Sequence, residues 1–227
     1  MVPPTAEHLA AMPTLINLVA TRCLDGDHAM MFRWYNDHVH LLMGCDALQE
    51  ATLYRRSSPG QEGGPEYLCL YAFASHSDFM VFETSDARAR AQAVVRAGWA
   101  GTGISILQRT QYRRLGRFSA QATDGDYRFA SLTLGAGPAQ DTVRWLNDRV
   151  HAAWGPVPGE RSWLQAWGAD DAGGEALVLG QGGDRHAVGQ AIDAWPDEAV
   201  DPAFGSRPGS VALRWQADYC RLRRWER

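Results

Sequence analysis

The chain contains nearly the same octapeptide twice, RWYNDHVH at residues 33–40 and RWLNDRVH at residues 144–151. The copies lie 111 positions apart, since 144 − 33 = 111. Two more pairs of segments match in the same order: EYLCLYAF from residue 66 with EALVLGQG from residue 175, and QYRRLGRF from residue 111 with DYCRLRRW from residue 218. Matches that keep their order while the offset drifts are typical of a duplication followed by small loop deletions. The sequence therefore predicts two copies of one folding unit, at residues 13–118 and 126–227.

Each copy has the same expected order of strands and helices. In the first copy Asp27 is the N-cap of a helix that ends at Gly44. Around it the patterns predict strands at residues 14–23, 47–56, 66–74 and 104–112, and a second helix at 77–98. The second copy repeats this order, with strands at 127–136, 161–168, 175–181 and 210–219 and helices at 138–155 and 184–195.

Strand, helix, strand, strand, helix, strand is the ferredoxin-like order. A single such unit has helices on one face of an antiparallel sheet, so its other face must be covered. The predicted fold is therefore α+β, with two ferredoxin-like repeats packed sheet to sheet as one intramolecular barrel.

Composition excludes several classes of function. All 22 basic residues are arginine, which removes Schiff-base, pyridoxal phosphate and P-loop mechanisms because each needs a lysine. The net charge of −4 gives no electrostatic footprint for nucleic acid. No stretch reaches the roughly 18 apolar residues of a membrane span, and the start MVPPTAEHLAAMP does not resemble a secretion signal. We expect a cytoplasmic protein that binds neither nucleic acid nor membranes.

No metal or cofactor site is expected either. The four cysteines show no C-x-x-C spacing and fit reduced core residues. His38 and His40 lie about 200° apart on a helix, so they cannot hold one metal ion together.

The helix at residues 28–43 has an apolar side and a polar side. At 100° per residue, His38 falls in the middle of the apolar residues and is predicted to face the sheet. His40 falls on the opposite side, with Arg33, Asn36 and Asp37, which is the expected solvent face.

The pattern W-Y-N-x-H-V-x-x-L-M, at residues 34–43, resembles the dimeric α+β barrel superfamily, and within it the branch of EthD-like proteins and small polyketide cyclases and isomerases. Members of that superfamily usually build a barrel from two subunits and often place a histidine and tyrosines in a pocket between sheet and helices. The resemblance implies a fused version with both halves in one chain. The second copy departs from the pattern, with Leu146 and Arg149 in place of Tyr35 and His38.

This difference predicts a working pocket in the first copy. His38 is the candidate general base or acid, and Tyr35 the candidate partner of a substrate oxygen. Trp34, Tyr54 and Tyr71 are candidate substrate-binding residues, although aromatic stripes of this kind also form ordinary cores. Arg149 needs a carboxylate partner, from a side chain or an acidic ligand, unless it extends to the surface.

Three functions remain open on the sequence. The first is a cofactor-independent enzyme that performs cyclisation, dehydration or isomerisation on a hydrophobic, aromatic or polyketide-like molecule. The second is a cofactor-free monooxygenase of the antibiotic-biosynthesis type, and the third is a non-catalytic ligand-binding or stress-response barrel. Because the chain supplies both halves of the barrel, we expect a monomeric pseudo-dimer, or a homodimer formed through another surface.

Overall fold

The computed structural model describes residues 15–57, 64–99, 103–119, 126–134, 160–166, 174–181 and 211–227. The chain divides into two compact units. The first comprises Met1–Arg56, Pro65–Gln111 and Arg221–Arg227, and the second Ser57–Gly64 and Tyr112–Cys220. Two strands of 16 residues, β4 (Ile104–Ser119) and β8 (Val211–Glu226), contribute to both units. A unit is therefore not one continuous piece of the chain.

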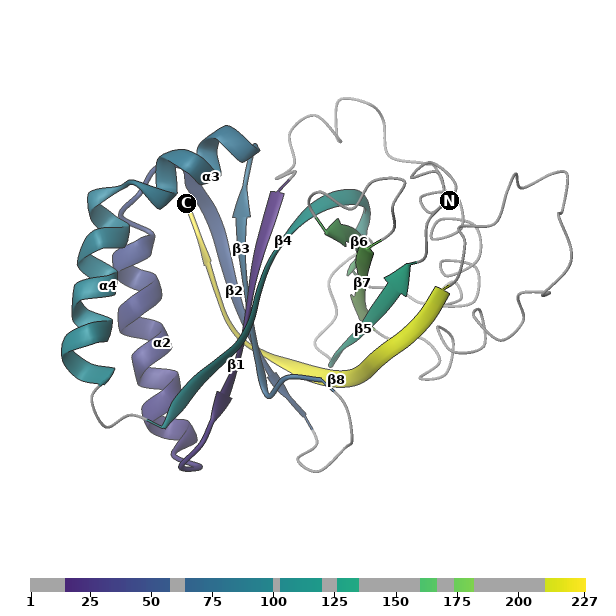
Figure 1. Ribbon diagram of the computed structural model, residues 1–227, viewed down its shortest axis with the longest axis horizontal. Helices are drawn as coiled ribbons and strands as arrows, with labels where there is room; N and C mark the ends of the chain where they lie inside the picture. Colours follow the sequence, from purple (N-terminus) through teal and green to yellow (C-terminus); the bar gives the residue numbers. More distant parts are fainter. Residues whose placement is uncertain are drawn as a thin grey trace, which may run out of the picture. The chain divides into compact units, whose positions relative to one another are not determined.

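Among the described residues of the first unit, three helices lie on one face of an antiparallel sheet (Figure 1). Its further elements are β1 (Leu15–Cys23), α2 (His28–Leu42), β2 (Leu48–Arg56), β3 (Tyr67–Phe73), α3 (His76–Glu83) and α4 (Asp86–Trp99). The hydrogen-bonded strand order is β4-β1-β3-β2-β8, and β3 runs antiparallel to both β1 and β2. The first four of these strands have the order of a ferredoxin-like sheet, as predicted.

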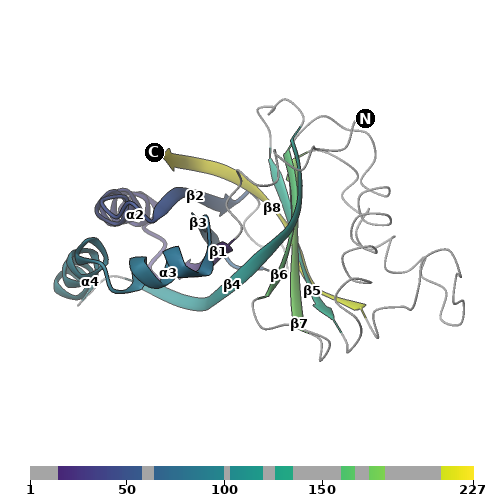
Figure 2. The same ribbon diagram turned by 90° about the horizontal axis from the view of Figure 1, so that it is seen from above.

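The second unit repeats that order. It contains β5 (Tyr127–Leu134), β6 (Glu160–Ala166) and β7 (Gly174–Gln181) (Figure 2). Their hydrogen-bonded order, with β8 and β4 at the ends, is β8-β5-β7-β6-β4. In it β5 runs antiparallel to both β7 and β8, and β6 runs antiparallel to both β7 and β4. Both units thus share the strands β4 and β8, and the described strands form one hydrogen-bonded series. The α+β prediction of two ferredoxin-like repeats is thereby confirmed, whereas the helices expected at 138–155 and 184–195 lie outside the described residues.

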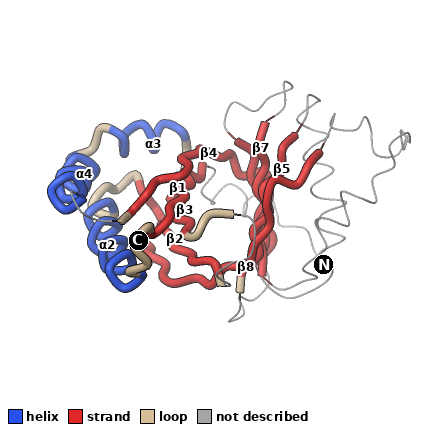
Figure 3. Tube along the Cα trace, turned by 60° about the horizontal axis from the view of Figure 1, so that its bottom comes forward, coloured by secondary structure: helices blue, strands red, loops and turns tan. Residues whose placement is uncertain are grey.

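Two boundaries differ from the prediction. The helix expected at 77–98 is two helices, α3 and α4, separated at Thr84 and Ser85 (Figure 3). The Ser85 hydroxyl donates to the Phe82 carbonyl and accepts from the Arg88 amide, so this one side chain ends α3 and begins α4. The strands β4 and β8 each continue seven residues beyond their expected ends, and in β4 the added residues pair with β6.

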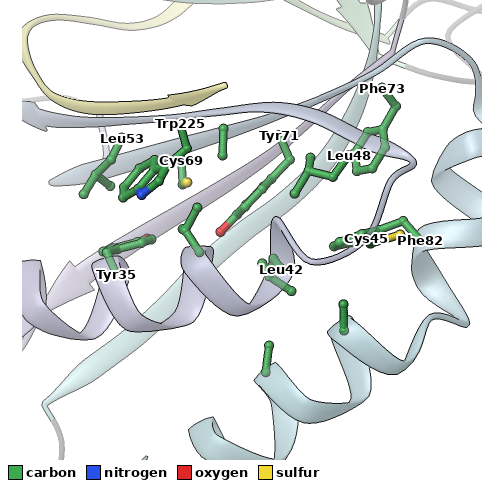
Figure 4. Packing of buried hydrophobic residues seen from close by; sticks show 14 of the residues in the cluster. Tyr35, Leu42, Cys45, Leu48, Leu53, Cys69, Tyr71, Phe73, Phe82 and Trp225 are labelled. Carbon is green, nitrogen blue, oxygen red and sulfur yellow. The ribbon is translucent and has the colours of Figure 1, made fainter. Parts of the chain in front are cut away.

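The core of the first unit lies between α2 and the sheet (Figure 4). The predicted aromatic stripe of β3 is confirmed, because Tyr67, Cys69, Tyr71 and Phe73 are all buried on the helix side. Trp225, near the end of β8, is buried in the same cluster. Burial of one such side chain contributes roughly 1.5–3 kcal/mol.

Arginines near the C-terminus hold the end of the chain on the first unit. Arg224 pairs with Glu50 at 2.7 Å, and Arg223 donates to the Asn36 side chain at 2.8 Å. Arg227 contacts both Asp46 and the Met43 carbonyl. Each exposed pair is worth only about 0.2–1 kcal/mol, so burial of Trp225 dominates this attachment. Among the described helices, none is long and apolar enough to cross a membrane.

Candidate functional site

The helix α2 carries most of the predicted site residues. Its N-cap Asp27 accepts a hydrogen bond from the Met30 amide at 2.8 Å, as the sequence predicted. The side chains buried against the sheet are Met31, Tyr35, Val39 and Leu42. On the opposite side, Arg33, Asp37 and His40 are exposed as predicted, whereas Asn36, expected on the same face, is half-buried.

His38 lies at the edge of the buried stripe, where α2 packs against α4. The stripe is centred nearer Tyr35 than expected, so His38 is directed toward α4 and not straight onto the sheet. Its ring stacks on Trp34, with centroids 5.0 Å apart and planes 7° from parallel. On the α4 side, a hydrogen bond with the backbone of Ala91 raises the pKa of His38, whereas the positive charge of Arg88 lowers it.

The imidazole of His38 is held in its neutral form. Burial lowers its pKa from 6.5 to about 4, and the positive charges of Arg109 and Arg88 act in the same direction. Its Nδ1 atom is buried and has no hydrogen-bond partner among the described residues. An unsatisfied buried polar atom costs about 1–3 kcal/mol, so it is a place where a ligand's hydrogen-bonding group would be stabilising.

Tyr35 is adjacent to His38 through Trp34 but has a different environment. Its ring lies 4.8 Å from that of Trp34, while its hydroxyl shares a hydrogen bond of 2.8 Å with the Thr21 hydroxyl. The side chain is 1% exposed, and burial raises its pKa well above the ordinary value. Tyr35 is therefore a satisfied core phenol in this structure.

The structure separates the remaining candidates. Tyr71 lies on the helix side of β3, where burial raises its pKa. Tyr54 pairs with Leu68 across β2 and β3, while its neighbour Leu53 pairs with Cys69. Because Cys69 faces the helices, Tyr54 faces the opposite side of the sheet and is not brought to His38. The remaining candidate, Arg149, lies outside the described residues.

Sequence reasoning missed a second cluster at the N-terminus of α2. The His28 Nδ1 atom lies 2.8 Å from the Tyr67 hydroxyl, and its Nε2 atom lies 3.6 Å from a Glu66 oxygen. The signal available in the sequence was a histidine directly after the N-cap Asp27. Its partners could not be named without the register of β1 and β3, which places Tyr67 opposite Thr21 near the end of β1.

The described part of the chain contains no set of side chains suited to bind a metal ion. No group of three or more His, Cys, Asp or Glu side chains there could hold a metal ion. The four cysteines are not paired with one another. Burial raises the pKa of the Cys69 thiol to about 12, so it is a core group and not a nucleophile.

Comparisons with known proteins define the fold and nothing finer. No family model and no curated protein matches the chain. A proposed monooxygenase from Fusobacterium nucleatum is similar in structure, with a TM-score of 0.58, 9% identity, and 94% of this chain and 95% of that chain covered. An anthrone oxidase-like protein has a TM-score of 0.55 and 12% identity, and the match covers 96% of this chain and 94% of that chain. A chlorite dismutase mutant from Candidatus Nitrospira defluvii has a TM-score of 0.54 and 9% identity, and the match covers 93% of this chain and 92% of that chain. The chain shares the α+β barrel fold of these proteins over nearly its whole length.

Proposed function

We propose that the protein is a cofactor-independent enzyme that acts on a hydrophobic aromatic or polyketide-like small molecule by proton transfer, with His38 as general base. The observation that carries this proposal is the buried, unpaired Nδ1 of a neutral imidazole. A neutral imidazole can accept a proton. A substrate hydroxyl or acidic C–H group would supply the donor that Nδ1 of His38 is missing. Cyclisation, dehydration and isomerisation all begin with this kind of step.

The flat ring of Trp34 supports the choice of substrate. It stacks on His38 and is partly exposed, so a planar aromatic molecule can pack beside the base. Tyr35 contributes to this arrangement by packing against Trp34, because its own hydroxyl is engaged with Thr21. We accordingly assign proton transfer to His38 and packing to Tyr35.

A second candidate function is cofactor-free oxygenation. Two structural neighbours are a proposed monooxygenase and an anthrone oxidase-like protein, and these names favour this alternative. Both reactions begin when a base removes an acidic proton, so the same site could carry out either reaction.

We further propose that the chain is a fused, tandem member of the EthD-like branch and works in the cytoplasm.

Anthrone is a suitable probe because it is flat, apolar and carries an acidic C–H group. With the purified full-length protein, we expect faster exchange of this hydrogen for deuterium under nitrogen. Oxygen uptake with formation of anthraquinone and water in air would select the monooxygenase. Binding without exchange or oxygen uptake would contradict both catalytic proposals and leave a binding protein. A visible absorption band in the purified protein would contradict the absence of a cofactor.

The role of His38 is tested by substitution with a side chain that cannot exchange a proton near neutral pH. His38→Gln should reduce exchange by roughly 10²–10⁴ while binding stays within about tenfold. The matched control is His40→Gln, because His40 lies on the exposed side of the same helix. Full activity in His38→Gln, or equal losses in both variants, would remove His38 from the reaction.

A further inference from the structure

A continuous series of rings runs through the first unit from His38 to His28. Successive ring centroids are 5.0 Å apart for His38 and Trp34, 4.8 Å for Trp34 and Tyr35, 6.2 Å for Tyr35 and Tyr67, and 6.0 Å for Tyr67 and His28. These separations are those of aromatic pairs in contact. Trp34 is partly exposed, whereas both tyrosines are fully buried. The series therefore links the surface at α2 to two phenols that solvent does not reach.

The two buried phenols differ in their hydrogen-bond partners. The hydroxyl of Tyr35 is bonded to the hydroxyl of Thr21, and that of Tyr67 is bonded to the imidazole of His28, both at 2.8 Å. A threonine hydroxyl is not a base at neutral pH, whereas an imidazole is. Only Tyr67 can therefore give up its proton to its partner.

Glu66 determines which nitrogen of His28 receives that proton. The Glu66 carboxylate lies 3.6 Å from Nε2 of His28, and its negative charge favours the tautomer that carries the hydrogen on this nitrogen. That tautomer leaves Nδ1 as the acceptor for the Tyr67 hydroxyl. The backbone amide of Cys23 donates to the other Glu66 oxygen at 2.8 Å and holds the carboxylate in place.

We propose that Tyr67 is a redox-active tyrosine. One electron leaves its phenol for a one-electron oxidant of the metal-complex class, such as a ruthenium(III) polypyridine, and at the same time its proton moves along the hydrogen bond to Nδ1 of His28. The products are a neutral tyrosyl radical and an imidazolium ion that faces the Glu66 carboxylate, and the oxidant is reduced by one electron. Trp34 is the entry point, because it is partly exposed and its ring contacts that of Tyr35. This role goes beyond the proposed proton-transfer chemistry and does not depend on it.

The distribution of tyrosines makes the proposal testable. All seven are buried, so no exposed phenol competes for the oxidant: Tyr35, Tyr54, Tyr67, Tyr71, Tyr112, Tyr127 and Tyr219. Tyr35 and Tyr67 are a matched pair, since both are fully buried in the same core and differ in the group that accepts the hydrogen bond.

The experiment oxidises the full chain with photochemically generated tris(bipyridine)ruthenium(III), with a pentaamminecobalt(III) complex as electron acceptor. Samples frozen after illumination are examined by electron paramagnetic resonance. The protein should show a neutral tyrosyl signal, identified by its change when ring-deuterated tyrosine is incorporated. Tyr67→Phe should lose this signal and Tyr35→Phe should keep it. Trp34→Phe should slow its appearance.

The proton acceptor is tested by His28→Gln, which keeps a polar side chain at the same place. We expect loss of the tyrosyl signal, and its return in His28→Gly when imidazole is added. Circular dichroism checks that each variant is folded, and any misfolded variant is replaced by Glu66→Gln, which should lower the radical yield. A signal that survives Tyr67→Phe, disappears in Tyr35→Phe, or is unchanged in folded His28→Gln would overturn the proposal.

Discussion

The two sheets present different side chains at equivalent positions. With the offset of 109 between the repeats, Tyr67, Cys69 and Tyr71 of β3 correspond to Ala176, Val178 and Gly180 of β7. All six residues are buried. The repeats thus keep one strand order while the side-chain volume on this face has diverged. In the first unit the face is filled by its own aromatic rings, and the two histidines for which we propose chemistry, His38 and His28, lie outside this packed centre.

The largest expected effect tests whether the first face is a tightly packed core. Phe73→Ala should destabilise the protein by about 3–5 kcal/mol, because Phe73 is fully buried and contacts Phe79 and Phe82. Val178→Ala on the second sheet removes much less volume and should cost only about 1–2 kcal/mol. Chemical denaturation measures both. Equal losses would show that the two faces do not differ in packing in the way their side chains indicate.

The next prediction concerns the C-terminal end of β8, which is part of the second repeat by sequence but lies in the first unit. Trp225 belongs to the second repeat by sequence but is buried in the first unit. Trp225→Ala should cost about 3 kcal/mol, and amide hydrogen exchange should accelerate in β3 before it does in β5. The reverse order would assign the C-terminal residues to the other unit.

Stability should also fall in acid because of His38. Its pKa is 6.5 when unfolded and about 4 when folded, so the unfolded chain binds a proton first as the pH decreases. The contribution is complete above pH 6.5 and is lost between pH 6.5 and 4, and it amounts to about 3 kcal/mol at most. His38→Gln should remove this pH dependence, whereas His40→Gln should keep it. The same acid dependence in both variants would place its origin elsewhere.

A smaller effect is expected at Ser57–Gly64, a segment of the first repeat by sequence that lies in the second unit. Gly64 has φ +80°, and a Cβ atom there would lie 2.9 Å from the Trp215 ring and the Tyr219 hydroxyl. Gly64→Ala should therefore cost about 1–3 kcal/mol from backbone strain and crowding, and exchange should accelerate in β5 and not in β3. Unchanged stability would show that this loop does not pack on β8 as described.

Most of the architecture followed from periodicity and from the internal repeat. The aromatic alternation of β3 and the N-cap Asp27 could be read locally, because each depends on neighbours in sequence. The break between α3 and α4 was a local signal that the prediction missed, because Ser85 bonds to Phe82 and Arg88, each only three residues away. The direction of His38 depends on α4, and the partners of His28 depend on strand register, so neither could be predicted from one helix alone.

The central claim, that His38 is a neutral base held ready for a ligand, is tested most directly by nuclear magnetic resonance titration of its imidazole. With labelled histidine and His38→Gln for assignment, the His38 signals should stay constant from pH 8 to 5 and titrate near pH 4. Addition of anthrone at neutral pH should shift its Nδ1 resonance while the His40 signals stay in place. An inflection near 6.5 together with no response to the ligand would contradict the account.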